Sequence, residues 1–141
     1  MRTKSWRIKS FGKVYELGAL VVINIDWLSE LMELFVEEVS AVLYEELKHA
    51  SPGTVRKLYN SIKGEVKQRV ADEIVKELLQ EVQVGGKPAD FLKLNIKGGQ
   101  SFFDIRDGES LLLVFDQIFS SHKYDLMIVE TLKIEYGLKF D

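Results

Sequence analysis

Carboxylates crowd the last third of the chain, and they are the side chains best suited to do chemistry. They are Asp104, Asp107, Glu109, Asp116, Asp125 and Glu130. Two converging acids can hold Mg²⁺ beside a phosphate, which is how metal-dependent nucleases work. The Glu-x-Lys doublet typical of such nucleases is absent, because two residues separate Glu130 from Lys133. A metal-dependent nuclease is therefore kept as an alternative, and no catalytic or metal-ligating residue is assigned.

Other catalytic patterns find little support in the composition. The two histidines, His49 and His122, are far apart in the sequence, whereas zinc sites need clustered ligands. The chain has no cysteine, which excludes a thiolate nucleophile and a disulfide. The glycine pairs at 85–86 and 98–99 fit neither a P-loop nor a dinucleotide-binding fingerprint. We expect no cofactor and a non-catalytic protein.

A basic arm at the N-terminus provides a second chemical hypothesis, nucleic-acid binding. Its cations are Arg2, Lys4, Arg7, Lys9 and Lys13, interleaved with Trp6 and Phe11. Such arms neutralise phosphates, and aromatic rings can stack on bases. The whole chain, however, carries a net charge of −3, and residues 26–50 contain seven acidic and one basic side chains. We therefore expect no nucleic-acid binding and retain it as an alternative.

The clearest structural signal is the break at Ser51-Pro52-Gly53-Thr54 between two helical patterns. Ser51 suits an N-cap, and Pro52 suits the first helical position, where its missing N–H costs nothing. Pro52 also disfavours the α conformation at the residue before it, which ends the preceding helix. The pattern predicts helices over about 27–49, with Asp26 as N-cap, and over about 52–81.

The second helix has an apolar stripe that cannot stay on one face. Its apolar residues recur every four positions, and each such step overshoots a full turn by about 40°. Either the helix bends near Gly64 or its two halves are buried against different partners. The two helices are also long for a domain of this size, so we expect part of the hairpin to project and to be covered by a partner. The interface candidates are Leu58, Ile62, Val70, Ile74, Leu78 and Val82.

The remaining segments alternate in the manner of strands. Residues 5–25 look extended, and residues 92–96 and 103–105 predict a hairpin with its turn at 97–100. Strict alternation over 131–140 predicts a further strand, whereas 109–119 fits a short helix or a buried strand, with the helix favoured. The expected class is α+β: N-terminal β-strands, a long antiparallel α-hairpin, and a C-terminal β-rich segment containing a hairpin and a short helix.

One segment resembles a known family. From Pro52 to Ile62 the proline, the leucine and Asn60-Ser61-Ile62 are spaced as in tail-completion (head–tail joining) proteins of long-tailed phages, and Glu135-Tyr136-Gly137 resembles their later Glu-x-Gly. The threonine is one place early, and the glycine that follows it in that family is missing. The resemblance implies a structural component of a virion, which we keep as an alternative function.

These observations predict a single domain, 1–141, in a non-catalytic binding or assembly protein. We expect it to form a homo-oligomer, or a subunit of a larger particle, through its α-hairpin. The longest apolar run, residues 19–23, is too short to cross a membrane, and the N-terminus lacks a signal-peptide core, so a cytoplasmic location is expected. Abundant lysine and glutamate with few asparagines are typical of thermophiles.

Overall fold

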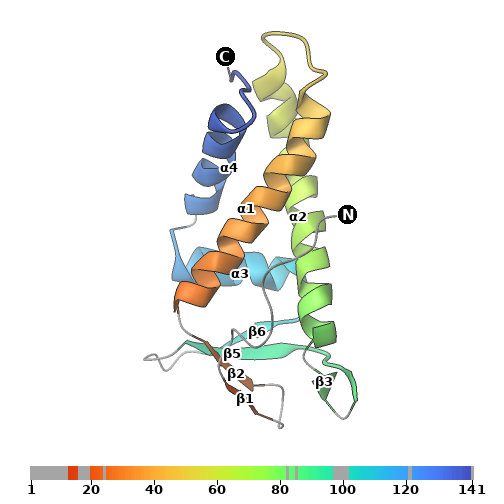
Figure 1. Ribbon diagram of the computed structural model, residues 1–141, viewed down its shortest axis with the longest axis vertical. Coiled ribbons are helices and arrows are strands. Elements are labelled where there is room, and N and C mark those ends of the chain that lie inside the picture. Colours follow the sequence, from red (N-terminus) through yellow and green to blue (C-terminus); the bar gives the residue numbers. More distant parts are fainter. Residues whose placement is uncertain are drawn as a thin grey trace.

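The computed structural model describes residues 13–15, 20–23, 25–81, 83–84, 86–96, 102–120 and 122–140. Two long helices form an antiparallel hairpin, with a small sheet at its lower end in Figure 1. A short helix, α3 (Gly108–Ile118), crosses between the sheet and the hairpin, and α4 (Lys123–Ile134) runs beside the upper part of the hairpin. The hairpin is thus covered by other parts of the same chain.

The expected α+β class, with its β-rich C-terminal segment, is wrong, because the chain is mostly helical. The four helices in the described part contain 23, 27, 11 and 12 residues. No described strand is longer than five residues. The two long helices are confirmed as α1 (Ile25–Leu47) and α2 (Val55–Glu81). Asp26 lies inside the first turn of α1 instead of capping it.

The connection between the two helices is a β-turn. The Thr54 N–H donates to the Ser51 carbonyl at 3.0 Å, and the Thr54 hydroxyl donates to the same oxygen at 2.6 Å. Pro52 and Gly53 occupy the two central positions, and Gly53 has a φ of 85°. These features define a type II turn, which requires a positive φ at its third residue. The Ser51 N-cap is therefore wrong: α2 begins at Val55, after the turn is complete.

The two halves of α2 contact different elements, which agrees with one of the two alternatives that the drifting stripe left open. In the first half, the Tyr59 ring contacts the Phe140 ring edge-on at 5.3 Å, and Lys67 pairs with Asp125 of α4 at 2.8 Å. In the second half, Asp72 holds the start of α3. Buried residues on α1 follow three- and four-residue steps and complete the core; they include Leu28, Leu31, Phe35, Val39 and Leu43.

The main sheet has the strand order β1-β2-β5-β6. Its strands are β1 (Lys13–Tyr15), β2 (Leu20–Ile23), β5 (Leu92–Ile96) and β6 (Phe102–Ile105). β2 and β5 are parallel, and the other two pairs are antiparallel. The antiparallel β5–β6 pairing expected from the alternating pattern is confirmed, and the turn expected at 97–100 lies outside the described residues. A separate two-stranded ladder joins β3 (Gln83–Val84) to β4 (Lys87–Pro88).

The strand expected over 131–140 is absent, and its alternating pattern has another cause. Leu132 belongs to α4, where it is buried on one helix face with Ile128 and Tyr124 at steps of four residues. Gly137 then adopts a φ of 72°, and the Leu138 N–H donates back to the Leu132 carbonyl at 3.0 Å, which ends the helix.

The segment after α4 lies along the upper end of the hairpin instead of joining a sheet. Tyr136 stacks on Tyr44 of α1 with ring centroids 4.6 Å apart. The Phe140 ring contacts the Tyr59 ring edge-on. The Arg56 guanidinium lies over the Phe140 ring, 5.1 Å from its centre. Alternate side chains of this segment therefore face the hairpin. When one side of an extended segment is buried, apolar and polar residues alternate in its sequence whether or not the segment belongs to a sheet.

Candidate binding groove

An open groove of about 470 Å³ lies between the strand β6 and the helix α3. We call it the β6–α3 groove. Its lining residues are Phe102, Phe103, Asp104, Ser110, Leu113, Val114 and Gln117. The volume falls within the roughly 300–1,000 Å³ common for ligand sites in proteins. Two of its large apolar side chains, Phe102 and Leu113, are 53% and 52% exposed, so the groove presents apolar surface to solvent.

One wall of the groove is the edge of the sheet. β6 is the last strand in the order β1-β2-β5-β6, and among the described strands it pairs only with β5. Successive side chains of a strand point to opposite faces. Ile105 is buried and Phe103 packs against the core, whereas Phe102 and Asp104 are exposed. The free edge therefore offers backbone groups together with one outward phenyl ring.

The other wall is one face of α3. Its lining residues, Ser110, Leu113, Val114 and Gln117, are spaced by three, one and three positions, which places them on the same side of a helix. Val114 is also buried in the core, whereas Leu113 beside it is half exposed. This face of α3 is therefore apolar in its middle, at Leu113 and Val114, and polar at its two ends, at Ser110 and Gln117.

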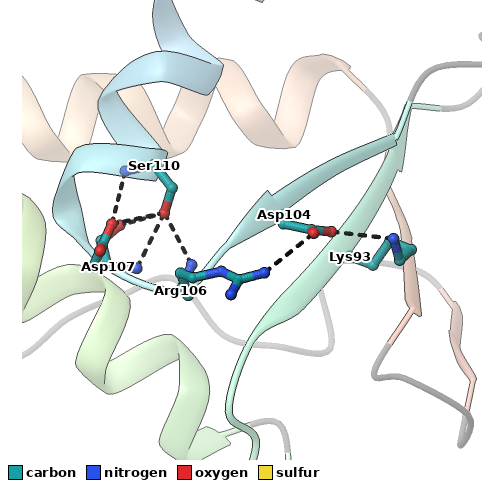
Figure 2. A network of polar contacts seen from close by, with 5 residues as sticks. All are labelled: Lys93, Asp104, Arg106, Asp107 and Ser110. Carbon is teal, nitrogen blue, oxygen red and sulfur yellow. Dashed lines mark hydrogen bonds and ion pairs between the residues drawn. The ribbon is translucent and has the colours of Figure 1, made fainter.

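The start of α3 is fixed by a reciprocal cap, which Figure 2 shows. The Ser110 N–H donates to Asp107 Oδ1 at 2.9 Å, and the Ser110 hydroxyl oxygen accepts from the Asp107 N–H at 3.1 Å. The same hydroxyl oxygen accepts from the Arg106 N–H at 2.9 Å. Because these bonds satisfy free amides at the helix start, the cap defines where β6 ends and α3 begins.

The same helix start is anchored to α2. The Gly108 N–H donates to Asp72 Oδ1 at 2.7 Å. A Cβ atom on residue 108 would lie 2.5 Å from the Asp72 backbone nitrogen, so this position accepts only glycine without a shift of the helices. Asp72 also places a carboxylate at the positive end of the α3 dipole. The wall of the groove is thereby held at a fixed position relative to the hairpin.

The charged residues near the groove form a chain on the outer face of β5 and β6. Asp104 lies 3.3 Å from Lys93 Nζ and 3.3 Å from Arg106 Nη2, as drawn in Figure 2. All three side chains are well exposed, so each pair contributes about 0–1 kcal/mol. The carboxylate of Asp107 follows Arg106 directly, so the two cations, Lys93 and Arg106, are matched by two carboxylates, Asp104 and Asp107. The Arg106 side chain is 60% exposed.

The capping carboxylate has an altered acidity. The hydrogen bond from the Ser110 backbone N–H, followed by that from its hydroxyl, lowers the pKa of Asp107 below its ordinary value of 3.8. Both bonds stabilise the charged form. The carboxylate is therefore ionised at neutral pH and serves the helix start.

A second charged cluster joins α2 to α4. Lys67 Nζ lies 2.8 Å from Asp125 Oδ1 and 5.4 Å from the centre of the Tyr124 ring. Burial, followed by the Asp125 charge, raises the pKa of Tyr59 to about 12. Burial, followed by Asp116 and Asp125, raises the pKa of Tyr124 to about 12. Both phenols stay neutral at ordinary pH, and the cluster links the two helices.

The carboxylates of the last third are thus spread over separate tasks. Asp107 caps α3, Asp104 pairs on the sheet, and Asp125 pairs with Lys67. Within the described ranges, no group of three or more histidine, cysteine, aspartate or glutamate residues could hold a metal ion. The β6–α3 groove itself is lined by apolar side chains and by the polar side chains of Asp104, Ser110 and Gln117.

Comparison of the chain with protein-family models, with curated proteins and with solved structures found no match. Function is therefore inferred from the residues of the chain itself.

Three of the six interface candidates lie inside the protein. Val70, Ile74 and Leu78 are buried in the core of the single chain. Val70 and Ile74 reach the surface at a smaller hollow of about 160 Å³, where Glu38 and Arg69 are among the neighbouring residues. The interface hypothesis for these residues stays a prediction.

Other candidates are half-buried or lie outside the described residues. Leu58 and Ile62 are half-buried and pack against the core. Val82 and the basic residues Arg2, Lys4, Arg7 and Lys9 lie outside the described residues. Lys13 lies in β1, where only its backbone is described. The nucleic-acid hypothesis therefore stays a prediction.

The groove residues were not predicted from the sequence, although two signals point to them. Phe102 and Phe103 are adjacent in a strand, so one of the two rings must face away from the core. Residues 111–115 are all apolar, and five consecutive residues of a helix span about 400°. Some of them must therefore be exposed, and Leu113 is the most exposed of the five.

Proposed function

We propose that this chain is a non-catalytic binding or assembly protein and that its β6–α3 groove receives a segment of a protein partner. The observation that supports this proposal is the position of Phe102 and Leu113. Each is more than half exposed, and both line the β6–α3 groove. Apolar surface on both walls of a groove gains free energy when a ligand removes it from water.

The size of this gain supports a modest but specific affinity. Complete burial of a large apolar side chain contributes about 1.5–3 kcal/mol. Phe102 and Leu113 have about half of their surface left to bury. The two residues together would therefore supply about 1.5–3 kcal/mol, and hydrogen bonds with the ligand would have to add the remainder.

Other exposed apolar residues offer a less suitable surface. Leu126 and Ile134 of α4 are 66% and 75% exposed, but the exposed Glu130 lies between them along the same helix. Scattered exposed apolar residues are ordinary on protein surfaces. Neither residue lines the groove. In the described part of the chain, no helix combines the length and apolar character needed to cross a bilayer.

Selection from a phage-displayed random peptide library tests the proposal. The targets are the wild-type chain, the double variant Phe102→Lys with Leu113→Lys, and the control Ile134→Lys. All three substituted positions are exposed, so circular dichroism should show three equally folded proteins. We expect peptides to be enriched on the wild type and the control and lost on the double variant. Equal enrichment on all three, or on none, would refute the groove as the binding site.

A mass measurement by light scattering on the same three proteins tests self-association. If a second copy is the natural partner, the wild type and the Ile134→Lys control should exceed the 16.2 kDa of one chain, and the double variant should not. A monomer in all three cases would rule out self-association through the groove, while leaving another protein as the partner.

A further inference from the structure

We infer that the link between Asp107 and Gly108 is a site of isoaspartate formation, which the folded protein holds inactive through the contact of α3 with α2. It is the one place in the sequence where a glycine follows an aspartate or an asparagine. An aspartate side chain can react with the next backbone nitrogen, and a glycine there has no side chain to obstruct the approach. The link lies where β6 ends and α3 begins.

The reaction needs no reagent other than water. The Gly108 nitrogen attacks Cγ of Asp107, the amide proton and the carboxyl hydroxyl leave together as water, and a succinimide ring remains. Water then opens the ring at one of its two carbonyl groups. When it opens at the main-chain carbonyl, the chain runs through Cβ and Cγ of residue 107. This product is isoaspartate, and its main chain is longer by one carbon at the start of α3.

The fold requires both residues of this pair for separate reasons. Asp107 caps α3, and its Oδ1 accepts a hydrogen bond from the Ser110 N–H at 2.9 Å. Residue 108 must be a glycine, because a Cβ atom there would lie 2.5 Å from the Asp72 backbone nitrogen. Asp107 is also exposed, so water reaches its carboxyl group. A reactive pair of residues is therefore a consequence of how β6 is joined to α3.

The contact with α2 restrains the attacking nitrogen. Gly108 is buried, and its N–H donates to Asp72 Oδ1 at 2.7 Å. The nitrogen must lose this proton before it can attack, and a carboxylate beside it opposes the negative charge that the loss creates. The nitrogen is also held toward α2 by the hydrogen bond, so it cannot turn toward Cγ of Asp107 without breaking that bond.

The conformation of Asp107 also opposes ring closure. Its ψ of −179° places the Gly108 nitrogen opposite its own nitrogen, and therefore staggered with respect to Cβ. A nearly flat ring requires this nitrogen and Cβ to be eclipsed, which needs a rotation that separates Gly108 from Asp72. The Ser110 N–H and hydroxyl hold the carboxyl group at 2.9 and 3.0 Å and lower its pKa, and an ionised carboxylate has no hydroxyl to lose. The reaction therefore requires the start of α3 to open.

The experiment measures isoaspartate at residue 107 by mass spectrometry of proteolytic peptides, with electron-transfer fragmentation to distinguish the two isomers. The wild type is incubated at pH 7, once folded and once unfolded in urea. We expect the folded chain to isomerise at least about tenfold more slowly, because the reaction waits for local opening. Asp107→Glu in urea should give no product, since its longer side chain would have to close a larger ring. Equal rates in the folded and unfolded wild type would refute the protection.

Three folded variants test which contact protects the link. Asp72→Ala removes the hydrogen-bond acceptor, Glu73→Ala removes the next, exposed carboxylate of α2, and Gly53→Ala weakens the distant turn between the long helices. We expect Asp72→Ala to raise the rate about tenfold, in keeping with the loss of a hydrogen bond to a charged group. The other two variants should stay within about twofold of the wild type, because they leave the local contact intact. The proposal is overturned if Asp72→Ala leaves the rate unchanged, if it slows the reaction and so identifies Asp72 as its base, or if Gly53→Ala raises the rate equally.

Discussion

Gly108 at the start of α3 donates its N–H to Oδ1 of Asp72 in the middle of α2, at a distance of 2.7 Å and across 36 residues of sequence. Asp72 also accepts a hydrogen bond from Gln68 Nε2 at 3.1 Å, which orients its carboxylate. The contact joins the two helices at the point where the chain leaves the sheet. It therefore fixes the α3 wall of the groove relative to the hairpin.

Gly108→Ala should destabilise the protein because the added methyl group has no space. The new Cβ would lie 2.5 Å from the Asp72 nitrogen and 2.9 Å from the Ala71 carbonyl carbon, and backbone atoms cannot move aside as a side chain can. We expect a loss of about 1–3 kcal/mol, the usual range for overpacking. Urea denaturation measures it. An unchanged midpoint would mean that α3 does not approach α2 this closely.

Gly64→Ala in α2 should have the opposite effect on stability. Gly64 lies within α2, and a Cβ atom built there meets nothing within 4 Å. Because alanine has the higher helix propensity, this variant should gain up to about 1 kcal/mol in the free energy of unfolding. The same urea titration serves as the measurement. A loss of stability would show that the site is covered in solution, for example by another protein chain.

In the turn between the long helices, substitution of Gly53 should destabilise the protein more than substitution of Ser51. Gly53→Ala places a side chain at a φ of 85°, which costs about 1–2 kcal/mol for an L-residue. Ser51 acts through its carbonyl oxygen, which alanine also has, so Ser51→Ala should stay within about 0.5 kcal/mol of the wild type. Thermal melts of the two variants compare them directly. If Ser51→Ala lowers the Tm more than Gly53→Ala does, the Ser51 side chain acts as a helix cap after all.

The sequence predicts the long helices well because each carries its own periodic pattern. Apolar residues repeat at helical spacing across α1. The drift of the α2 stripe left two alternatives, a bend near Gly64 or different contacts for the two halves, and the contacts of the two halves do differ. Helix boundaries were less accurate at the connection. The pair Pro52-Gly53 suits a helix start as well as a type II turn, and only the observed positive φ distinguishes the two.

The groove and the C-terminal segment were harder to predict because their patterns depend on distant residues. Tyr136 and Phe140 are half-buried by Tyr44 and Tyr59, far away in the sequence, and the resulting alternation imitates a strand. Likewise, nothing local shows that Gly108 must be a glycine, since the reason is the backbone of Asp72. Local patterns report that a side is buried, but not which element covers it.

The Asp107 cap predicts a pH dependence at the acid end. The pKa of this carboxyl is lowered in the folded protein, so its stabilisation is fully present above the ordinary value of 3.8 and is lost as the pH falls through the folded-state pKa. Asp107→Ala should cost about 1 kcal/mol at pH 7, in line with the loss of a helix cap. The difference between wild type and variant should shrink below pH 3.8. Asp107→Asn, which keeps an acceptor, should lose less at pH 7.

Urea titrations of the three proteins across the acid range check this prediction. A gap between wild type and Asp107→Ala that stays constant with pH would show that the carboxylate charge does not contribute. In that case the Asp107 side chain would stabilise the helix start equally well in its protonated form, as a neutral acceptor of the hydrogen bonds from Ser110.

Tyr59 and Tyr124 predict a matching effect at the alkaline end. Burial raises the pKa of each phenol from 10.0 to about 12, so their neutral forms stabilise the fold below pH 10. This stabilisation is lost as the pH rises from about 10 to about 12, because the unfolded chain releases its protons first. Tyr59→Phe and Tyr124→Phe should therefore each lose less stability over this range than the wild type. Absorbance titration at the tyrosinate band should show one phenol fewer ionising near pH 12 in each variant. If both variants lose stability with pH as steeply as the wild type, the α2–α4 contact around Lys67 and Asp125 does not bury these rings in solution.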